Sequence, residues 1–323
     1  MGANAPPRDP TADDATGADG PSADAPAGPD PTPENEGANG QSTATADGYD
    51  APKLAVATFG DPGGHPVLFC HGTPGSRRLG ELFDDAASDQ GVHLLAVDRP
   101  GYGDSPAQSG ERQVDVADAI DAVLRDRGVT RLGIVAFSGG SRDAFAVAAR
   151  SSATVECIDV VAGSVPPRFQ TDQPTVQRLL GALARRTPRA LGALVRGQAW
   201  IAGHASPSFV TTQYTSEDAE TDIPDEAAEL VKRDFREAIA GDASGFVHET
   251  RRLATSWSVP DEVDGGVVRF WHGECDTNVP IDGARRFADS IDGTTLTALE
   301  GADHLGTLLA VRERVMARQR NVL

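Results

Sequence analysis

The chain has 323 residues, and its 48 acidic against 29 basic residues give a formal net charge of −19 and a pI near 4.7. A surface with this charge repels polyanions, so nucleic acid is not expected as a partner. All basic residues except Lys53 and Lys232 are arginine, and high acidity with almost no lysine is typical of proteins adapted to high salt.

The cysteine count and the apolar runs bear on cellular location. Three cysteines are too few for a disulfide framework, and they lack metal-ligand spacing. The N-terminal segment has no apolar core of a signal peptide, and no run approaches the ~18 apolar residues of a membrane span. We therefore expect a reduced, cytoplasmic protein with no membrane among its partners. Its oligomeric state is not predicted.

The first 50 residues differ in composition from the rest. They contain ten acidic residues, one basic residue and eight prolines, but no Leu, Ile, Val, Phe or Trp. Such a segment cannot bury enough apolar surface to offset the entropy lost on ordering. We predict a disordered acidic tail over residues 1–50, which carries nearly half of the net charge, and one folded domain over residues 51–323.

From residue 54 onward, short β-branched runs alternate with helical patterns. The expected strands are Leu54–Phe59, Val67–Cys70, His93–Val97, Leu132–Phe137, Val155–Val161, Val267–Trp271 and Thr294–Leu299. The expected helices between them are Arg77–Gln90, Gln113–Arg127, Gly140–Arg150, Ile281–Ile291 and Leu305–Arg318. This alternation predicts an α/β protein with a mostly parallel central sheet and helices on both faces. Ligands of such sheets bind beyond the carboxyl ends of the strands, so the loops there are the candidates for chemistry.

Two glycine-containing loops follow early strands. Residues 71–75 read His-Gly-Thr-Pro-Gly, in which Gly allows close backbone approach and Pro fixes φ. Residues 98–105 read Asp-Arg-Pro-Gly-Tyr-Gly-Asp-Ser and lack the GxxG continuation of a dinucleotide-binding motif. We interpret the first loop as the source of a backbone donor, the Thr73 N–H, and the second as a shaped loop beside the pocket.

A serine stands at the next strand end. Ser138 lies between the strand predicted over Leu132–Phe137 and a helix, and two glycines follow it, which is the layout of a nucleophile elbow. Ala136 takes the place of the usual first glycine and is still small. The N–H groups of Gly139 and Thr73 could together form an oxyanion hole, aided by the dipole of the following helix.

An acid and a histidine follow two late strands. Asp276 lies in His-Gly-Glu-Cys-Asp-Thr-Asn-Val-Pro (272–280), and His304 lies in Gly-Ala-Asp-His-Leu-Gly (301–306). The order Ser138, Asp276, His304 is that of a Ser, acid, His triad. Together, these loops resemble those of the α/β-hydrolase superfamily, and the resemblance runs from about residue 54 to the C-terminus.

The resemblance implies a role for each residue. Ser138 would be the nucleophile, His304 the general base and Asp276 the carboxylate that orients it, with the Thr73 and Gly139 N–H groups as the oxyanion hole. The residue chemistry agrees, because a serine hydroxyl becomes a good nucleophile when a histidine takes its proton and a carboxylate stabilises the imidazolium.

Other residues near these loops have alternative readings. Asp303 and Asp98 are rival acids, but Asp303 adjoins the histidine and would point away from it, and Asp98 is interpreted as shaping its loop. No metal or other cofactor is expected, since His248 is not part of an H-E-x-x-H pattern. Four residues are interpreted as structural: His71 and His272 as hydrogen-bonders within loops, and Cys70 and Cys275 as buried packing residues.

About 100 residues separate the strand at 155–161 from the strand at 267–271, far more than a crossover needs. Helical spacing occurs over Val176–Leu183, Pro188–Ile201, Ala227–Ala240 and Ser244–Trp257. The resemblance implies a helical lid over about residues 165–258. Five of its aromatic residues could line a pocket or pack within the lid: Phe169, Trp200, Phe209, Tyr214 and Phe246.

We therefore expect a serine hydrolase that cleaves an ester-type bond of a small or medium substrate through an acyl-enzyme. The same triad also serves acyltransferases, C–C hydrolases, aminopeptidases and cofactor-free perhydrolases. A non-catalytic binding protein that has kept the fold is the alternative from a different functional class.

Overall fold

The computed structural model describes residues 43–44, 50–51, 53–107, 115–170, 175–241, 243–253, 257, 259–261, 263 and 268–320. Strands β1 (Thr43–Ala44) and β2 (Asp50–Ala51) pair as a short antiparallel sheet. The other residues of the predicted disordered tail lie outside the described residues, so that prediction is not tested.

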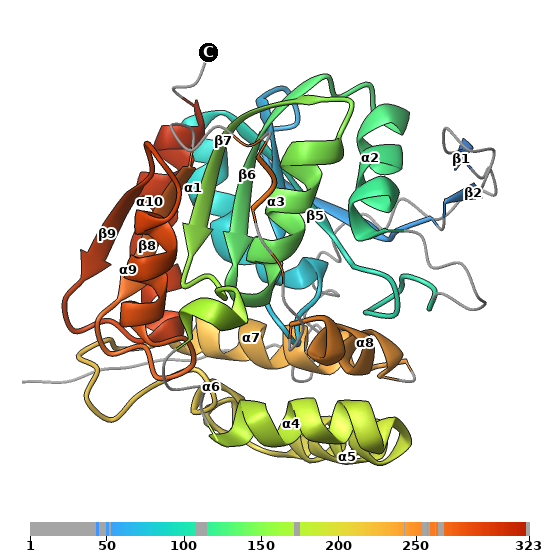
Figure 1. Ribbon diagram of the computed structural model, residues 1–323, viewed down its shortest axis with the longest axis vertical. Helices are drawn as coiled ribbons and strands as arrows, with labels where there is room; N and C mark the ends of the chain where they lie inside the picture. Colours follow the sequence, from blue (N-terminus) through green and yellow to red (C-terminus); the bar gives the residue numbers. More distant parts are fainter. Residues whose placement is uncertain are drawn as a thin grey trace, which may run out of the picture. The chain divides into compact units, whose positions relative to one another are not determined.

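Within the described residues, seven strands form the main sheet (Figure 1). In spatial order they are β3 (Val56–Gly60), β5 (Val92–Val97), β4 (His65–Cys70), β6 (Arg131–Phe137), β7 (Thr154–Val161), β8 (Val268–Gly273) and β9 (Thr295–Leu299). Strand β3 is antiparallel to β5, and all other neighbours are parallel. The predicted mostly parallel sheet is confirmed.

Helices cover both faces of this sheet, as predicted. One face packs against α2 (Val116–Asp126), α3 (Ser141–Arg150) and α9 (Ile281–Asp289). The other packs against the 3-10 helix η1 (Arg77–Phe83), α1 (Asp84–Gln90) and α10 (His304–Arg320). Because both faces are covered, the central strands are largely apolar, and all residues of Leu132–Phe137 in β6 are buried. Among the described helices, none combines the length and apolarity needed to cross a membrane.

Between β7 and β8 the chain forms a helical insert, by which we mean residues 175–253. Its helices are α4 (Thr175–Arg186), α5 (Pro188–His204), α6 (Ser208–Thr211), α7 (Asp225–Ala238) and α8 (Ser244–Leu253). Helices α7 and α8 lie across the sheet edge toward which β6 and β7 point, and α4 and α5 lie beyond them (Figure 1). The insert therefore lies over the carboxyl ends of the strands, where the candidate site was predicted.

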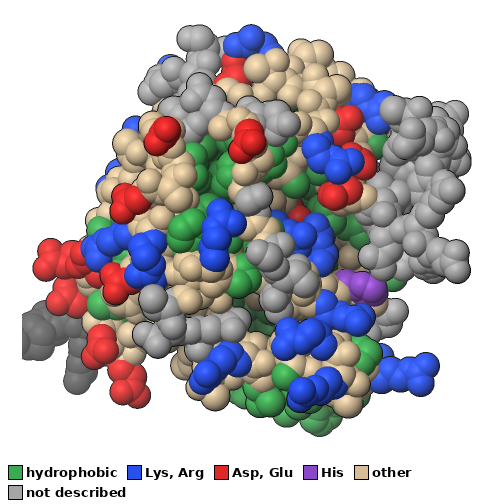
Figure 2. All heavy atoms as spheres, in the orientation of Figure 1, with side chains coloured by type: hydrophobic (Ala, Val, Ile, Leu, Met, Phe, Trp, Pro, Cys, Tyr) green, Lys and Arg blue, Asp and Glu red, His purple; other side chains and the backbone are tan. Residues whose placement is uncertain are grey.

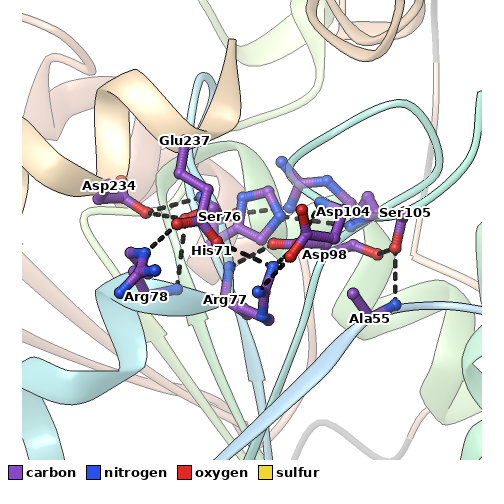
Figure 3. Close-up of polar contacts among 11 residues, drawn as sticks. Ala55, His71, Ser76, Arg77, Arg78, Asp98, Asp104, Ser105, Asp234 and Glu237 are labelled. Atoms are coloured by element: carbon purple, nitrogen blue, oxygen red, sulfur yellow. Dashed lines mark hydrogen bonds and ion pairs between the residues drawn. The ribbon is translucent and has the colours of Figure 1, made fainter. Parts of the chain in front are cut away.

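Charged side chains join helix α7 of the insert to the core (Figure 3). Glu237 forms ion pairs with Arg78 and, at 2.9 Å, with Arg77. Arg77 is largely buried and also pairs with Asp98 and, at 2.6 Å, with Asp104. Several carboxylates thus share one buried guanidinium, which offsets the cost of removing these charges from water.

A second carboxylate of α7 lies beside this cluster. Oδ1 of Asp234 accepts hydrogen bonds from the backbone N–H of Ser76 at 2.7 Å and from its hydroxyl at 2.8 Å. Burial raises the pKa of Asp234 to about 7; the bonds from Ser76 oppose this rise, whereas the charges of Asp98 and Glu237 add to it. Since an unfolded aspartate titrates near ~3.9, the folded chain binds the proton more tightly. The contribution of Asp234 to stability therefore falls as pH rises from about 4 to about 7.

Replacing this carboxylate tests the linkage. Asp234→Asn keeps an oxygen acceptor for Ser76 but has no charge to bury. We expect its Tm to exceed that of the parent at pH 8, and the difference to shrink toward pH 5, in thermal unfolding followed by circular dichroism at one salt concentration. The matched control is Asp225→Asn, which removes an exposed carboxylate from the same helix. A Tm for Asp234→Asn at or below the parent value at pH 8 would contradict the assignment.

Candidate active site

Ser138 stands at the end of β6, where the chain turns sharply. Its φ of +50° lies in the left-handed region that residues other than glycine adopt rarely. A 3-10 turn over Ser138–Gly140 leads directly into α3. Such a strained turn between strand and helix presents the serine at the sheet edge. Ser138 is half-buried, whereas all the β6 residues from Leu132 onward are fully buried.

The backbone of this turn is held by the loop that follows β7. The Ser138 carbonyl accepts hydrogen bonds from the Ser164 N–H at 2.9 Å and from the Ser164 hydroxyl at 3.1 Å. The Ser141 hydroxyl donates to the Ser164 carbonyl at 2.8 Å. Sequence reasoning missed these two supporting serines, because their contacts join segments that are 23 and 26 residues apart in the chain and no local motif marks them.

Gly139 touches the loop that contains Thr73. A Cβ built on Gly139 would lie 2.1 Å from the Thr73 Oγ1 atom and 3.4 Å from the Thr73 backbone nitrogen. No side chain fits there, and the two backbone segments predicted to donate to an oxyanion therefore lie side by side. Gly140 is equally confined, since its Cβ would lie 2.2 Å from the carbonyl oxygen of Cys70.

His304 and Asp276 form a buried pair. His304 is the first residue of α10, and its Nδ1 lies 2.8 Å from Oδ2 of Asp276. A proton on Nδ1 that is donated to this carboxylate leaves Nε2 free to accept another proton. The ring of Phe137, next to Ser138 in the chain, lies 4.9 Å from the His304 ring centroid.

Asp276 is held as an anion by several donors. Its Oδ1 accepts the N–H groups of Asn278 and Val279, both at 2.9 Å, and the Nε2 atom of His272 lies 3.3 Å from Oδ2. Burial alone would raise the pKa of Asp276, but the charge of His304 and hydrogen bonds from His272 and His304 outweigh it and hold the pKa well below its usual range. The carboxylate therefore stays ionised through the neutral range.

The two rival acids have other partners. Asp303 accepts the N–H of Gly306 at 2.7 Å, at the start of α10, and the N–H of Ser216 at 3.0 Å. Asp98 pairs with Arg77, accepting the Arg77 N–H at 2.6 Å. Their carboxylates shape a helix end and a loop, which is how the sequence analysis interpreted Asp98.

The helical insert also supports the site. The ring of Tyr214 stacks nearly parallel on that of His304, with centroids 6.3 Å apart. Burial raises the pKa of Tyr214 strongly, so its phenol stays neutral. Three contacts join the segment around Tyr214 to the late loops: Asn278 Nδ2 to Gln213 O at 2.9 Å, Leu305 N to Tyr214 O at 3.1 Å, and Ser216 N to Asp303 Oδ2 at 3.0 Å.

The other aromatic residues of the insert have different surroundings. Phe246 is buried in an apolar cluster formed mainly by the insert, and Phe169, which precedes the insert, packs against Phe287 of α9. Trp200 and Phe209 are exposed. Of the five residues named as possible pocket walls, Tyr214 contacts the predicted triad, through the ring of His304.

Three of the four residues interpreted as structural have the surroundings expected of them, and the fourth, Cys275, does not. His71 hydrogen-bonds the Gly72 carbonyl at 2.9 Å, and His272 hydrogen-bonds Val279 at 2.7 Å, so both fix loops. Cys70 is buried, and burial raises the pKa of its thiol to about 12. Cys275 was expected to be buried but is partly exposed, because its loop lies at the protein surface.

Comparison with known proteins identifies the fold. A family model described as "alpha/beta hydrolase fold" matches residues 65–211. No curated protein sequence matches the chain. An α/β-hydrolase-fold protein from Nakamurella multipartita is 24% identical, with a TM-score of 0.57, over 87% of this chain and 98% of that one. An esterase from Exiguobacterium antarcticum is 19% identical, with a TM-score of 0.61, over 86% and 97%. A bromoperoxidase from Bacillus anthracis is 15% identical, with a TM-score of 0.62, over 82% and 94%.

Gly139→Ala tests the close approach of the two loops. The added methyl would overlap the Thr73 side chain and push the Thr73 N–H away. Losing one oxyanion donor typically costs about 10²–10³ in kcat, and we expect a loss of that order with p-nitrophenyl acetate.

Two further variants separate this effect from misfolding. Adding Thr73→Gly removes the overlapping atoms and should recover part of kcat. Gly197→Ala places its methyl in open space and should leave kcat unchanged. Full activity of Gly139→Ala would show that the loops are not arranged as described.

Proposed function

The chain has the α/β-hydrolase fold, and from this premise we propose that it is a serine hydrolase that cleaves an ester bond through an acyl-enzyme. The observation that carries the proposal is the buried Asp276 and His304 pair, 2.8 Å apart, at the same sheet edge as the strained turn of Ser138. An ionised carboxylate with a neutral histidine is the arrangement that activates a serine hydroxyl.

The proposed acylation step uses each group once. His304 Nε2 takes the proton of the Ser138 hydroxyl while Oγ attacks the ester carbonyl carbon, and Asp276 stabilises the imidazolium that forms. The carbonyl oxygen becomes an oxyanion, which the N–H groups of Thr73 and Gly139 stabilise. As the tetrahedral intermediate collapses, the imidazolium returns its proton to the alkoxide, and the alcohol leaves.

Deacylation reverses these roles with water. His304 takes a proton from a water molecule, the resulting hydroxide attacks the acyl carbon, and Ser138 leaves with the proton that the imidazolium returns. The products are a carboxylic acid and the regenerated enzyme. The neutral phenol of Tyr214 against His304 adds no charge beside the imidazolium and helps to keep the ring in place.

The first test is turnover on a panel of p-nitrophenyl esters, lactones, amino-acid amides and β-diketones. We expect ester hydrolysis by the parent and a fall in kcat of at least about 10⁴-fold in Ser138→Ala. The matched control is Ser152→Ala, at a surface turn. Retention of full esterase activity by Ser138→Ala would refute the proposal, and hydrolysis of amides or β-diketones alone would favour the other chemistries of the same triad.

A second test distinguishes Asp276 from its neighbour Asp303. Asp276→Asn removes the charge that orients His304 and stabilises its imidazolium, and kcat should fall by about 10⁴-fold, with KM little changed. Asp303→Asn keeps an acceptor for the start of α10 and should lower Tm while retaining most of kcat. A larger loss of kcat in Asp303→Asn than in Asp276→Asn would reverse the assignment.

A further inference from the structure

The exposed apolar residues of the protein gather in one place. Among the described residues, all the large hydrophobic side chains that are 37–69% exposed lie in the helical insert, between residues 176 and 209: Val176, Leu179, Leu194, Trp200, Ile201 and Phe209. Scattered single residues of this kind are ordinary on a protein surface. A concentration of them on one hairpin and the turn after it indicates an interaction surface.

The same segment differs from the rest of the chain in charge. Residues 173–216 contain five arginines and no Asp or Glu, in a chain whose net charge is −19. All five arginines are exposed, and none forms an ion pair with a described residue: Arg178, Arg185, Arg186, Arg189 and Arg196. Figure 2 shows basic side chains over α4, α5 and α8 beside hydrophobic ones, whereas acidic side chains lie over other parts of this face.

Helices α4 and α5, which we call the outer hairpin, carry these five arginines and most of the exposed apolar side chains. Leu191 and Val195 of α5 are buried against α7 and α8. Leu194 and Ile201 are exposed and seven residues apart, so they lie along one line of the helix. Arg189 and Arg196 have the same spacing and form a second line, roughly 150° around the helix from the apolar one. The exposed surface of α5 is thus largely apolar, with these two arginines along one border.

A groove runs beside that border. It measures about 400 Å³ and is lined by Arg189 and Arg196 of α5 and by Ser244, Val247 and His248 of α8. Two guanidinium groups at one groove are suited to a phosphate group, which each can bind through two hydrogen bonds.

We propose that the outer hairpin docks on the surface of an anionic phospholipid membrane, with Leu194, Trp200 and Ile201 entering the interface and Arg189 and Arg196 binding lipid phosphates. A helix with basic residues bordering a Trp- and Leu-containing apolar face has the chemistry of an interfacial membrane helix. Tryptophan prefers the depth of the lipid headgroups. The acidic remainder of the chain would be repelled by such a surface, which favours contact through the hairpin alone.

Other occupants fit the surface less well. The acidic tail over residues 1–50 has charges that complement the arginines, but it contains no Leu, Ile, Val, Phe or Trp to cover the exposed apolar side chains. A second copy of the chain in a two-fold contact would bring the five arginines of one hairpin against those of the other. The sequence analysis expected no membrane partner because no segment can span a bilayer, but docking at the surface requires no such segment.

Trp200 supplies a direct readout in the full chain. It is 69% exposed, whereas the other two tryptophans, Trp257 and Trp271, are 9% and 4% exposed. On addition of phosphatidylcholine vesicles containing 30% phosphatidylglycerol, we expect the tryptophan fluorescence emission to shift to shorter wavelength. Brominated lipids in the same vesicles should quench this fluorescence. The protein should co-sediment with these vesicles and only weakly with pure phosphatidylcholine.

Charge-matched variants test the role of the arginines. Each basic residue near an anionic leaflet contributes roughly fivefold in affinity, so Arg189→Gln with Arg196→Gln should weaken vesicle binding about 30-fold. The control variant, Arg125→Gln with Arg285→Gln, removes two exposed arginines that lie outside the helical insert, and it should bind vesicles like the parent. Leu194→Ser with Ile201→Ser should lose binding at any salt concentration. Trp200→Phe should keep co-sedimentation but lose the fluorescence shift.

Several results would overturn the proposal. One is unchanged tryptophan emission with no co-sedimentation. Another is a loss of vesicle binding in Arg125→Gln with Arg285→Gln that equals the loss in Arg189→Gln with Arg196→Gln. The third is a dimer in solution that Leu194→Ser with Ile201→Ser dissociates. Ser138→Ala should bind vesicles like the parent, because docking requires no turnover. Failure of the membrane contact is therefore distinguishable from failure of the proposed hydrolase activity.

Discussion

The left-handed backbone of Ser138 at the end of β6 is the constraint on which the rest of the site depends. The turn brings Gly139 against the Thr73 loop and Gly140 against the backbone of Cys70, so it requires residues without a side chain at both positions. The Ser138 carbonyl is held in turn by two hydrogen bonds from Ser164. Strain of this kind persists when neighbouring contacts determine the backbone more strongly than its own preference does.

Asp276 and His304, the proposed acid and base, depend on a different set of contacts, and part of it comes from the helical insert. Asp276 is bound by N–H groups of its own loop and by two histidines, which keeps it charged although it is buried. The segment around Tyr214 holds the loops of both Asp276 and His304, because its Gln213 and Tyr214 carbonyls accept hydrogen bonds from them. The insert therefore contributes to the geometry of the site as well as covering the strand ends. A shift of the insert would change the position of His304.

Local sequence signals predicted the strands, the helices and the order of the loops, because apolar periodicity and glycine positions act over a few residues. Contacts between distant segments could not be predicted in this way. The support of Ser138 by Ser164, the stacking of Tyr214 on His304 and the exposure of Cys275 depend on how loops far apart in sequence meet. The distribution of charge over the surface could not be predicted from local signals either. The total of −19 indicated an acidic surface, but the exposure of the arginines on α4 and α5 became evident only when the buried face of each helix was known.

The central claim is that Ser138 is the nucleophile activated by His304. The most direct measurement is peptide mapping by mass spectrometry after reaction of the folded protein with a fluorophosphonate, which traps an activated serine covalently. We expect one adduct, located on Ser138, that forms slowly or not at all when His304 is replaced by Ala. An adduct on another residue, or labelling of Ser138 at an unchanged rate in His304→Ala, would contradict it.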